Sequence, residues 1–205
     1  FHSIPFHSIP FHCNREVFCI FKELNFHNIR TQLALQCAPV IAGVKIANLL
    51  CINWDCEKKL NDVMCNSDMM ICKLCTGKKG VTYLIYRKAE LEKYILSEPV
   101  YAFLKSEGYT DFSLDSILNR FKLRYASYMD NHEDFPHEMG LLLGYPIEDV
   151  KGFVENKGKD YLYSGYWKVY ANRKAKISLF EKFENARETM ITFVSNGGRI
   201  EEFCN

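Results

Sequence analysis

The sequence has almost no net charge and no long apolar segment. Against 26 Lys and Arg residues it carries 25 Asp and Glu residues, a formal net charge of +1. Such a balance lacks the basic excess typical of proteins that bind nucleic acid or acidic membranes, so we expect neither partner. The best apolar run, over residues 38–52, contains Pro39, Gly43, Lys45 and Asn48 and falls short of the roughly 18 apolar residues that span a bilayer. We interpret this run as a buried helix.

A secretory signal and a disulfide framework are also missing. The N-terminus has no basic region followed by an apolar segment, which a signal peptide requires. Nine cysteines, an odd number, are spread without the regular spacing of a disulfide scaffold. In a chain of 205 residues this distribution indicates free thiols in a reducing compartment, so we expect a cytoplasmic protein. Tolerance of free thiols would also suit an anaerobe.

The first twelve residues repeat a short unit, FHSIP, twice and then stop at FH. The repeated histidines raise the idea of metal binding. A proline at every fifth position and the short length favour a disordered or artefactual leader, which we place over residues 1–27. The whole chain is 48% hydrophobic and 25% charged, which is typical of a globular protein. Residues 28–205 are therefore expected to form a single domain.

The hydrophobic pattern predicts an α/β fold of the α+β type: a small mixed sheet of about three strands, including a hairpin, covered by several helices. Residues 70–75 and 81–87 are rich in β-forming side chains, and the sequence TGKKG between them predicts the hairpin turn. A third strand is expected over residues 166–170. Helices are expected over residues 28–35, 39–50, 55–64, 88–96, 98–107, 113–128, 147–155 and 175–194.

Four blocks of residues are similar to the pattern of a known protein family. They are QCAP at 36–39 with AGVK at 42–45 and Asn48; LIYR at 84–87; FPHEMG at 135–140 with LGYPIEDVKGF at 143–153; and ENKG at 155–158 with SGYWKVY at 164–170. Together they resemble the domain-of-unknown-function family 3793 (DUF3793), over about residues 28–203. The resemblance implies one fold unit in a bacterial cytosolic protein, and it implies no mechanism.

The first candidate site is catalytic and combines Cys37 and His137 with a carboxylate from Glu138 or Asp149. Pro39 is expected to start a helix, which would place Cys37 beside a helix N-terminus. The positive end of a helix dipole lowers the pKa of a thiol and makes it a better nucleophile. His137 would accept the proton, and the carboxylate would orient the imidazole. The alternative is a small core cysteine and a histidine that only hydrogen-bonds the following helix.

The second candidate is redox or metal chemistry in the cysteine-rich segment from Cys51 to Cys75. Cys72 and Cys75 have the C-x-x-C spacing of zinc and dithiol sites. On a regular strand, residues three apart point to opposite faces, so these thiols would share neither a metal nor an easy disulfide. No second pair follows at zinc-finger spacing. The sequence identifies no cofactor.

The third candidate is a ligand-binding surface of aromatic and basic side chains. Tyr166, Lys168 and Tyr170 of the strand expected over 166–170 would share one face. Lys157 and Lys159, with Arg87 of the hairpin, would add positive charge to it. Such a set would receive phosphate or carboxylate, whereas the alternative is a solvated strand face. The predicted ligand-binding residues are Lys45, Asn48, Arg87, Tyr166, Lys168 and Tyr170.

These candidates lead to one preferred function and two alternatives. The preferred hypothesis is an accessory binding module for a small anionic molecule or a protein partner. The first alternative is a thiol-dependent enzyme that uses Cys37 and His137. The second is a redox or metal-linked protein that uses the cysteines from Cys51 to Cys75. The sequence does not decide between an enzyme and a binding module.

Overall fold

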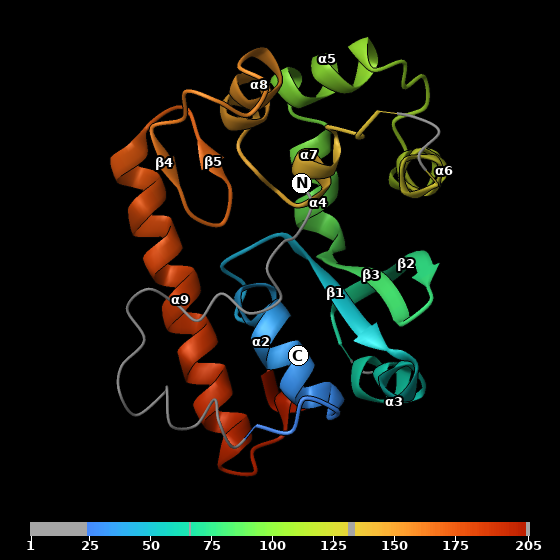
Figure 1. Cartoon of the computed structure of the whole chain (residues 1–205), viewed down its shortest axis with the longest axis vertical. Helices are drawn as coiled ribbons and strands as arrows, with labels where there is room; N and C mark the ends of the chain where they lie inside the picture. Colours follow the sequence, from blue (N-terminus) through green and yellow to red (C-terminus); the bar gives the residue numbers. More distant parts are fainter. Residues whose placement is uncertain (1–23, 66, 131–133, 204–205) are drawn as a thin grey trace.

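The fold is built around a three-stranded antiparallel sheet (Figure 1). The computed structural model describes residues 24–65, 67–130 and 134–203. The strands of this sheet, in spatial order, are β1 (Ala47–Asn53), β3 (Gly80–Arg87) and β2 (Met69–Gly77). A two-stranded sheet consists of β4 (Tyr163–Ser164) and β5 (Lys168–Val169). The helices are α2 (Ile29–Ile41), α3 (Trp54–Met64), α4 (Lys88–Ile95), α5 (Glu98–Ser106), α6 (Leu114–Met129), α7 (Met139–Leu142), α8 (Ile147–Glu155), α9 (Arg173–Ser195) and the 3-10 helix η1 (Ile200–Phe203). The predicted α+β class is confirmed.

The hairpin of β2 and β3 has the turn that the sequence predicts. Gly77 pairs with Gly80, so Lys78 and Lys79 form a two-residue loop. Gly80 also lets β1 approach closely, because a Cβ atom there would lie 2.0 Å from the carbonyl oxygen of Ile52. Only glycine fits this position.

The two helices predicted on either side of Pro39 are instead one helix followed by a strand. The side chain of Asn28 caps α2 by accepting a hydrogen bond from the N–H of Arg30, and α2 then continues through Pro39. Gly43, with φ of +72°, follows the end of the helix. Residues 47–50, predicted as helical, belong to β1 and pair with β3. A short apolar run has no periodicity that separates helix from strand, and the pairing with β3 decides the outcome.

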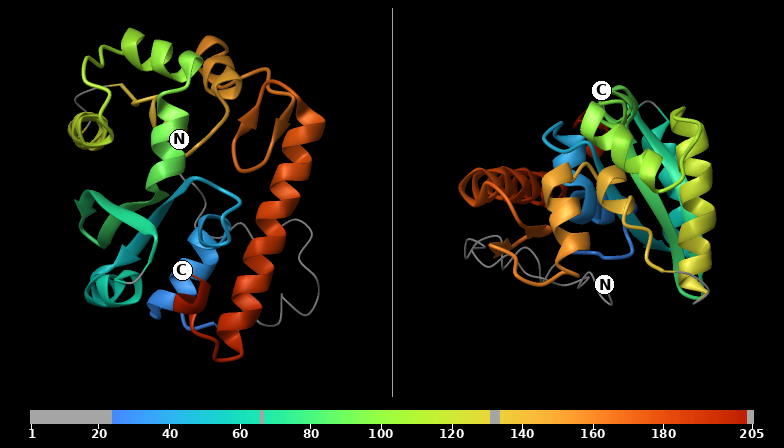
Figure 2. Two further views of the ribbon diagram at one scale, coloured as in Figure 1. Left: turned by 180° about the vertical axis from the view of Figure 1, so that it is seen from behind. Right: turned by 90° about the horizontal axis from the view of Figure 1, so that it is seen from above.

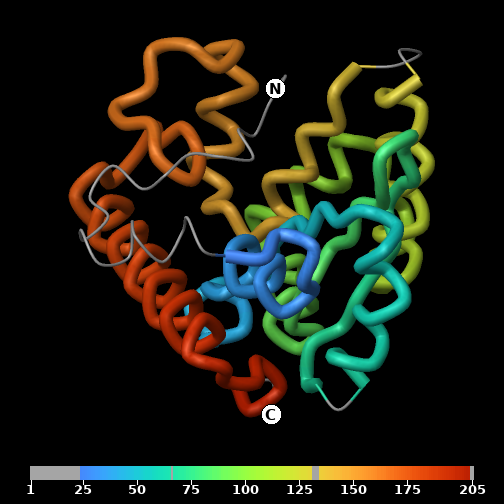
Figure 3. Tube along the Cα trace, turned by 60° about the horizontal axis from the view of Figure 1, so that its bottom comes forward, coloured from blue at the N-terminus to red at the C-terminus, as the bar shows by residue number. Residues whose placement is uncertain are grey.

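Helices cover both faces of the sheet (Figure 2). On one face, α2 and α3 and the end of α9 share a core that includes Leu33 and Ile85. On the other face, α4, α6 and α7 share a core that includes Leu84 and Phe121. Figure 3 shows α9 running beside α2, to which it makes extensive contact. None of the helices in the described part of the chain is long and apolar enough to cross a membrane.

The strand predicted over residues 166–170 is shorter than expected and forms part of a small hairpin. Tyr166 and Trp167 lie in the connection between β4 and β5, so the regular alternation expected along one strand does not apply. Trp167 packs with Phe180 and Phe183 of α9 in a third, smaller core. This hairpin therefore lies between α8 and α9 instead of extending the central sheet (Figure 1).

Candidate functional site

Lys45 is buried at the corner where α2 leads into β1. Its side chain ammonium donates hydrogen bonds to the carbonyl oxygen of Ala47 and to Oδ1 of Asn48, both at 2.6 Å. The same nitrogen lies 5.4 Å from the centre of the Tyr145 ring. Burial lowers the pKa of Lys45 to about 7, because removal from water disfavours the charged form. Lys45 and Asn48 are thus brought together, but their polar atoms bind each other and the backbone.

Arg87 lies at the same corner, and its side chain also donates its hydrogen bonds to the protein backbone. Its Nε donates to the carbonyl oxygen of Val40 at 2.9 Å, and its Nη2 donates to that of Ile41 at 3.1 Å. These carbonyls belong to the last turn of α2, where no further helical turn supplies donors, although the carbonyl oxygen of Val40 also accepts the N–H of Gly43 at 3.0 Å. The guanidinium therefore completes the end of the helix and also opposes its negative dipole.

The three predicted ligand residues near the small hairpin are also engaged in internal packing. Lys168 donates to the carbonyl oxygen of Gly158 at 2.6 Å and lies 5.0 Å from the centre of the Tyr161 ring. Tyr166 packs against Phe180 and Phe183. The hydroxyl oxygen of Tyr170 is buried and has no hydrogen-bond partner among the described residues. These residues do not form one anion-binding surface with Lys45, Asn48 and Arg87.

The placement of Cys37 at a helix N-terminus is wrong. Cys37 lies in the C-terminal half of α2, and its side chain is fully buried. The thiol points to the carbonyl oxygen of Leu49, at 3.9 Å. Burial raises the pKa of Cys37, and the positive charge of Lys45 only partly opposes this effect. A raised pKa keeps the sulfur as the unreactive thiol.

His137 and Glu138 lie together just before α7, in surroundings that do not include Cys37. The His137 ring packs between Phe135 and Phe153, and burial lowers the pKa of His137. Glu138 is completely buried; its Oε1 accepts a hydrogen bond from the Tyr109 hydroxyl at 2.9 Å and forms an ion pair with Arg124 at 2.7 Å. Cys37 belongs to the core between α2 and the sheet. The structure therefore does not assemble the predicted catalytic group.

The cysteines of β1 and β2 share one face of the sheet, contrary to the expectation for a regular strand. Cys72 pairs with Leu84 and Cys75 pairs with Thr82, two residues apart on β3, because a β-bulge interrupts the register between Lys73 and Cys75. Cys51 also pairs with Thr82, and its sulfur lies 3.6 Å from the hydroxyl oxygen of that residue. Within the described residues, no three His, Cys, Asp or Glu side chains are placed so that they could hold a metal ion. The Cys72 and Cys75 pair remains a prediction.

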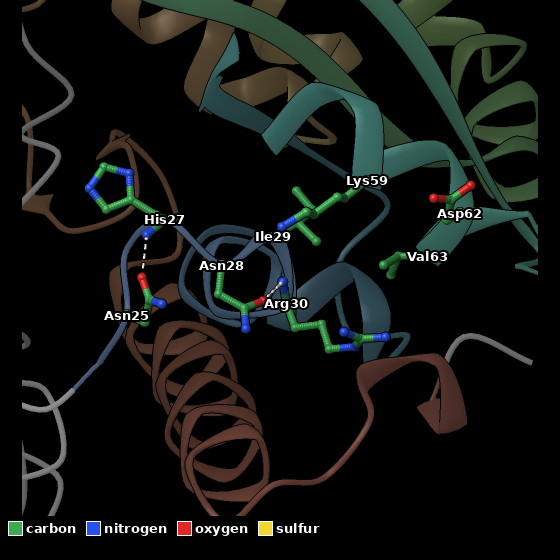
Figure 4. Close-up of a pocket in the computed structure, with 8 residues that line it drawn as sticks. All are labelled: Asn25, His27, Asn28, Ile29, Arg30, Lys59, Asp62 and Val63. Carbon is green, nitrogen blue, oxygen red and sulfur yellow. Dashed lines mark hydrogen bonds between the residues drawn. The ribbon is translucent and has the colours of Figure 1, made fainter. Parts of the chain in front are cut away.

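A pocket of about 280 Å³ opens between the start of α2 and α3 (Figure 4). Three basic side chains line it, from His27, Arg30 and Lys59. Figure 4 shows Lys59 reaching from α3 over Ile29 towards the first turn of α2. The remaining lining residues are Asn25, Asn28, Ile29, Asp62 and Val63.

No sequence pattern predicted this pocket. Asn25 and His27 fall within the predicted leader, of which residues 1–23 lie outside the described part of the chain. His27 contacts the domain: the Cys56 thiol donates to its carbonyl oxygen at 3.2 Å, and Nδ2 of Asn53 lies 3.2 Å from its Nδ1. On α3 the hydrophobic pattern predicts only the buried face. Lys59 is exposed, and its residue type does not distinguish it from any other solvated residue of a helix.

A family described as "protein of unknown function (DUF3793)" matches residues 33–204. The chain belongs to the DUF3793 family. No curated protein and no solved structure matches it.

Three of the four blocks that carry the DUF3793 resemblance meet around Tyr145, although they are far apart in the sequence. Lys45 from the first block lies over the Tyr145 ring. Trp167 from the last block stacks on the same ring with a centroid separation of 4.6 Å. Asp149 accepts a hydrogen bond from Nε1 of Trp167 at 2.8 Å. In this DUF3793 domain, these residues join the central sheet to α8 and the small hairpin.

Gly152→Ala in the DUF3793 domain is expected to lower the free energy of unfolding by about 1–3 kcal/mol. A Cβ atom at this position would lie 2.5 Å from both Cβ and Cγ of Tyr170. Atoms so close to the backbone cannot move away without shifting the segment that holds them. Urea denaturation measures the change. Gly77→Ala is the matched control, since its nearest atom would be 3.9 Å away, and equal losses in both variants would contradict the expectation.

Proposed function

We propose that this DUF3793 domain is a binding module for a small molecule that carries a carboxylate or phosphate group. The observation that supports the proposal is the pocket of about 280 Å³ lined by His27, Arg30 and Lys59. Basic residues that line one concave site favour an anionic ligand, because charge-assisted hydrogen bonds are the strongest that a side chain can offer. The proposal keeps the ligand class predicted from the sequence and moves the site to the other end of α2.

Two of the basic groups are held in defined orientations. Nε and Nη2 of Arg30 both bind the carboxylate of Glu201, with Nε at 3.0 Å from Oε2. Oδ1 of Asn53 accepts the N–H of Cys56, so its Nδ2 is the atom that faces Nδ1 of His27. Nδ1 of a neutral His27 therefore accepts, and the ring proton is on Nε2.

Lys59 is the basic residue of the pocket whose charge is least compensated. It is exposed, and it forms no ion pair with an acidic side chain among the residues that the structure describes. Arg30, in contrast, shares its charge with Glu201. We therefore expect Lys59 to contribute more than Arg30 to the attraction of an anion. The thiol-enzyme alternative has no comparable support, because Cys37 is fully buried.

Titration of the whole chain with sodium pentanoate and with inorganic phosphate tests the proposal. At least one of these anions is expected to shift the backbone amide resonances of Arg30 and Lys59. Lys59→Ala is expected to weaken binding at least about 10-fold, because one hydrogen bond to a charged group contributes about 1.5–3 kcal/mol. Lys58→Ala is the matched control, since Lys58 is an exposed neighbour on α3 outside the pocket lining. Absence of any saturable shift, or equal losses in both variants, would overturn the proposal.

A further inference from the structure

Arg30, which lines the pocket, already binds a carboxylate of the protein itself. Its Nε donates to Oε2 and Oε1 of Glu201 at 3.0 and 3.2 Å, and its Nη2 donates to Oε1 of the same carboxylate. Glu201 belongs to η1, 171 residues further along the chain. A carboxylate or phosphate ligand would use the same adjacent N–H groups of a guanidinium. Glu201 therefore occupies Arg30 in the way that an anionic ligand would.

The side chain of Glu201 can leave Arg30 without any movement of η1. The backbone of η1 is fixed on one side by Ile200, which is fully buried in the core that α2 and α3 share. It is fixed further along by Phe203, whose ring meets the Phe193 ring edge-on at a centroid separation of 4.8 Å. Exchange of Glu201 for a ligand thus requires only the rotation of one side chain.

The ion pair between Arg30 and Glu201 is also weak enough to be exchanged. Its two side chains are 35% and 22% exposed, so water screens their attraction and the pair contributes little to stability. Figure 4 shows the Arg30 side chain extended from the first turn of α2 towards the ribbon of η1. Nη2 of Arg199 lies 3.7 Å from Oε1 of Glu201, so the carboxylate keeps a basic partner after it leaves Arg30.

We infer that Glu201 is an internal competitor of the anionic ligand, so that η1 regulates the affinity of the pocket. The inference rests on the proposed function and adds its regulation. Before a ligand binds, Arg30 and Glu201 neutralise each other, and Lys59 supplies the attraction. A bound anion then displaces the Glu201 carboxylate and accepts the hydrogen bonds of Arg30. The free energy needed to break the pair lowers the apparent affinity below that of an Arg30 without a partner.

Glu201→Gln tests the inference, because it removes the competing charge and keeps the size of the side chain. The affinities for inorganic phosphate and for pentanoate are measured by amide chemical shifts. Glu201→Gln is expected to tighten binding about 5-fold, which corresponds to the roughly 1 kcal/mol that a partly exposed ion pair can contribute. Glu202→Gln is the matched control, since Glu202 is an exposed neighbour on η1 that forms no ion pair with a described residue. It is expected to change the affinity less than about 2-fold, because an exposed charge without direct contact is screened.

A second background shows whether the effect passes through Arg30. In Arg30→Gln, the further change Glu201→Gln is expected to alter the affinity no more than Glu202→Gln does, because no guanidinium is left to release. A gain of about 5-fold in this background would overturn the inference, since Glu201 would then act on the ligand by repulsion alone and independently of Arg30.

The outcomes separate this inference from the proposed function. Equal affinities of the unchanged chain, Glu201→Gln and Glu202→Gln, with binding still weakened by Lys59→Ala, overturn the competition and leave the anion site standing. Saturable binding that only Glu201→Gln tightens, and only when Arg30 is present, supports both. Failure of phosphate and pentanoate to bind any of these proteins overturns both proposals.

Discussion

Asp149→Ala is expected to lower the free energy of unfolding by about 3–5 kcal/mol, because three buried donors lose their acceptor. Asp149 is 2% exposed. Its Oδ1 accepts the backbone N–H groups of Tyr170 and Ala171 at 2.8 and 3.1 Å, and its Oδ2 accepts Nε1 of Trp167 at 2.8 Å. Each unsatisfied buried donor costs about 1–3 kcal/mol, and the three costs are not fully additive. One carboxylate thus fixes the small hairpin to α8.

Urea denaturation followed by tryptophan fluorescence measures this effect. The sequence has two tryptophans, so a Trp54→Phe background makes Trp167 the reporter of the hairpin itself. Asp149→Asn is expected to lose less stability than Asp149→Ala, because the amide oxygen still accepts the two backbone N–H groups. Glu148→Ala is the neighbouring control: its ion pair with Lys176 involves a side chain that is 40% exposed, and such pairs contribute about 0–1 kcal/mol. A loss below about 1 kcal/mol for Asp149→Ala would show that the hairpin does not depend on this carboxylate.

The sequence predicted best those elements whose determinants are local. The TGKKG turn defines the β2–β3 hairpin, since a two-residue loop places Gly77 opposite Gly80. The predicted bounds of α8, residues 147–155, agree with the structure, and Pro146 immediately before this helix explains why its start is well marked. The closing helix α9 is two residues longer at its start than predicted and one residue longer at its end. These signals need no knowledge of the rest of the fold.

The errors occurred where tertiary contacts override local patterns. Residues 47–50 became part of a strand because β3 offers them a complete hydrogen-bonding edge. The side chain of Gln36 stabilises the strand conformation: its Nε2 donates to the carbonyl oxygen of Cys51, and its Oε1 accepts the N–H of the same residue. The bulge between Lys73 and Cys75 is a property of strand pairing, so spacing alone assigned Cys72 and Cys75 to opposite faces.

The candidate site was harder to predict than the fold, because its residues carry no common motif. Lys45, Asn48 and Arg87 were expected to bind a ligand, yet carbonyl oxygens of the second half of α2 and of the start of β1 accept the hydrogen bonds of their side chains. His27 and Lys59 face one pocket only because the segment before α2 packs against α3. No spacing in the sequence encodes that contact.

Lys45→Met is expected to reduce the pH dependence of stability between pH 7 and pH 8.5. Burial lowers the pKa of Lys45 to about 7 from an ordinary value of 10.5. Between these values the unfolded chain binds one proton more than the folded chain, so the free energy of unfolding rises with pH. The slope approaches about 1.4 kcal/mol per pH unit, which gives a rise of roughly 1.5 kcal/mol over this window. The lysine thus destabilises the folded state most at the acidic end of the window.

The difference between variants isolates this contribution, because the buried Cys37 thiol, on which the charge of Lys45 acts, has a raised pKa and stays protonated throughout this window. Burial raises the pKa of Cys37 and Cys72 above 9.0; such thiols lower stability as the pH approaches the value of the unfolded thiol, so the comparison ends at pH 8.5. Methionine has a similar length and carries no charge, and apolar replacements of buried charges are often neutral or stabilising. Urea denaturation at four pH values gives the slope of the free energy of unfolding against pH. Lys58→Met, at an exposed position, is the control. Parallel curves for Lys45→Met and the unchanged chain would show that the amine stays protonated, held by Ala47, Asn48 and the Tyr145 ring.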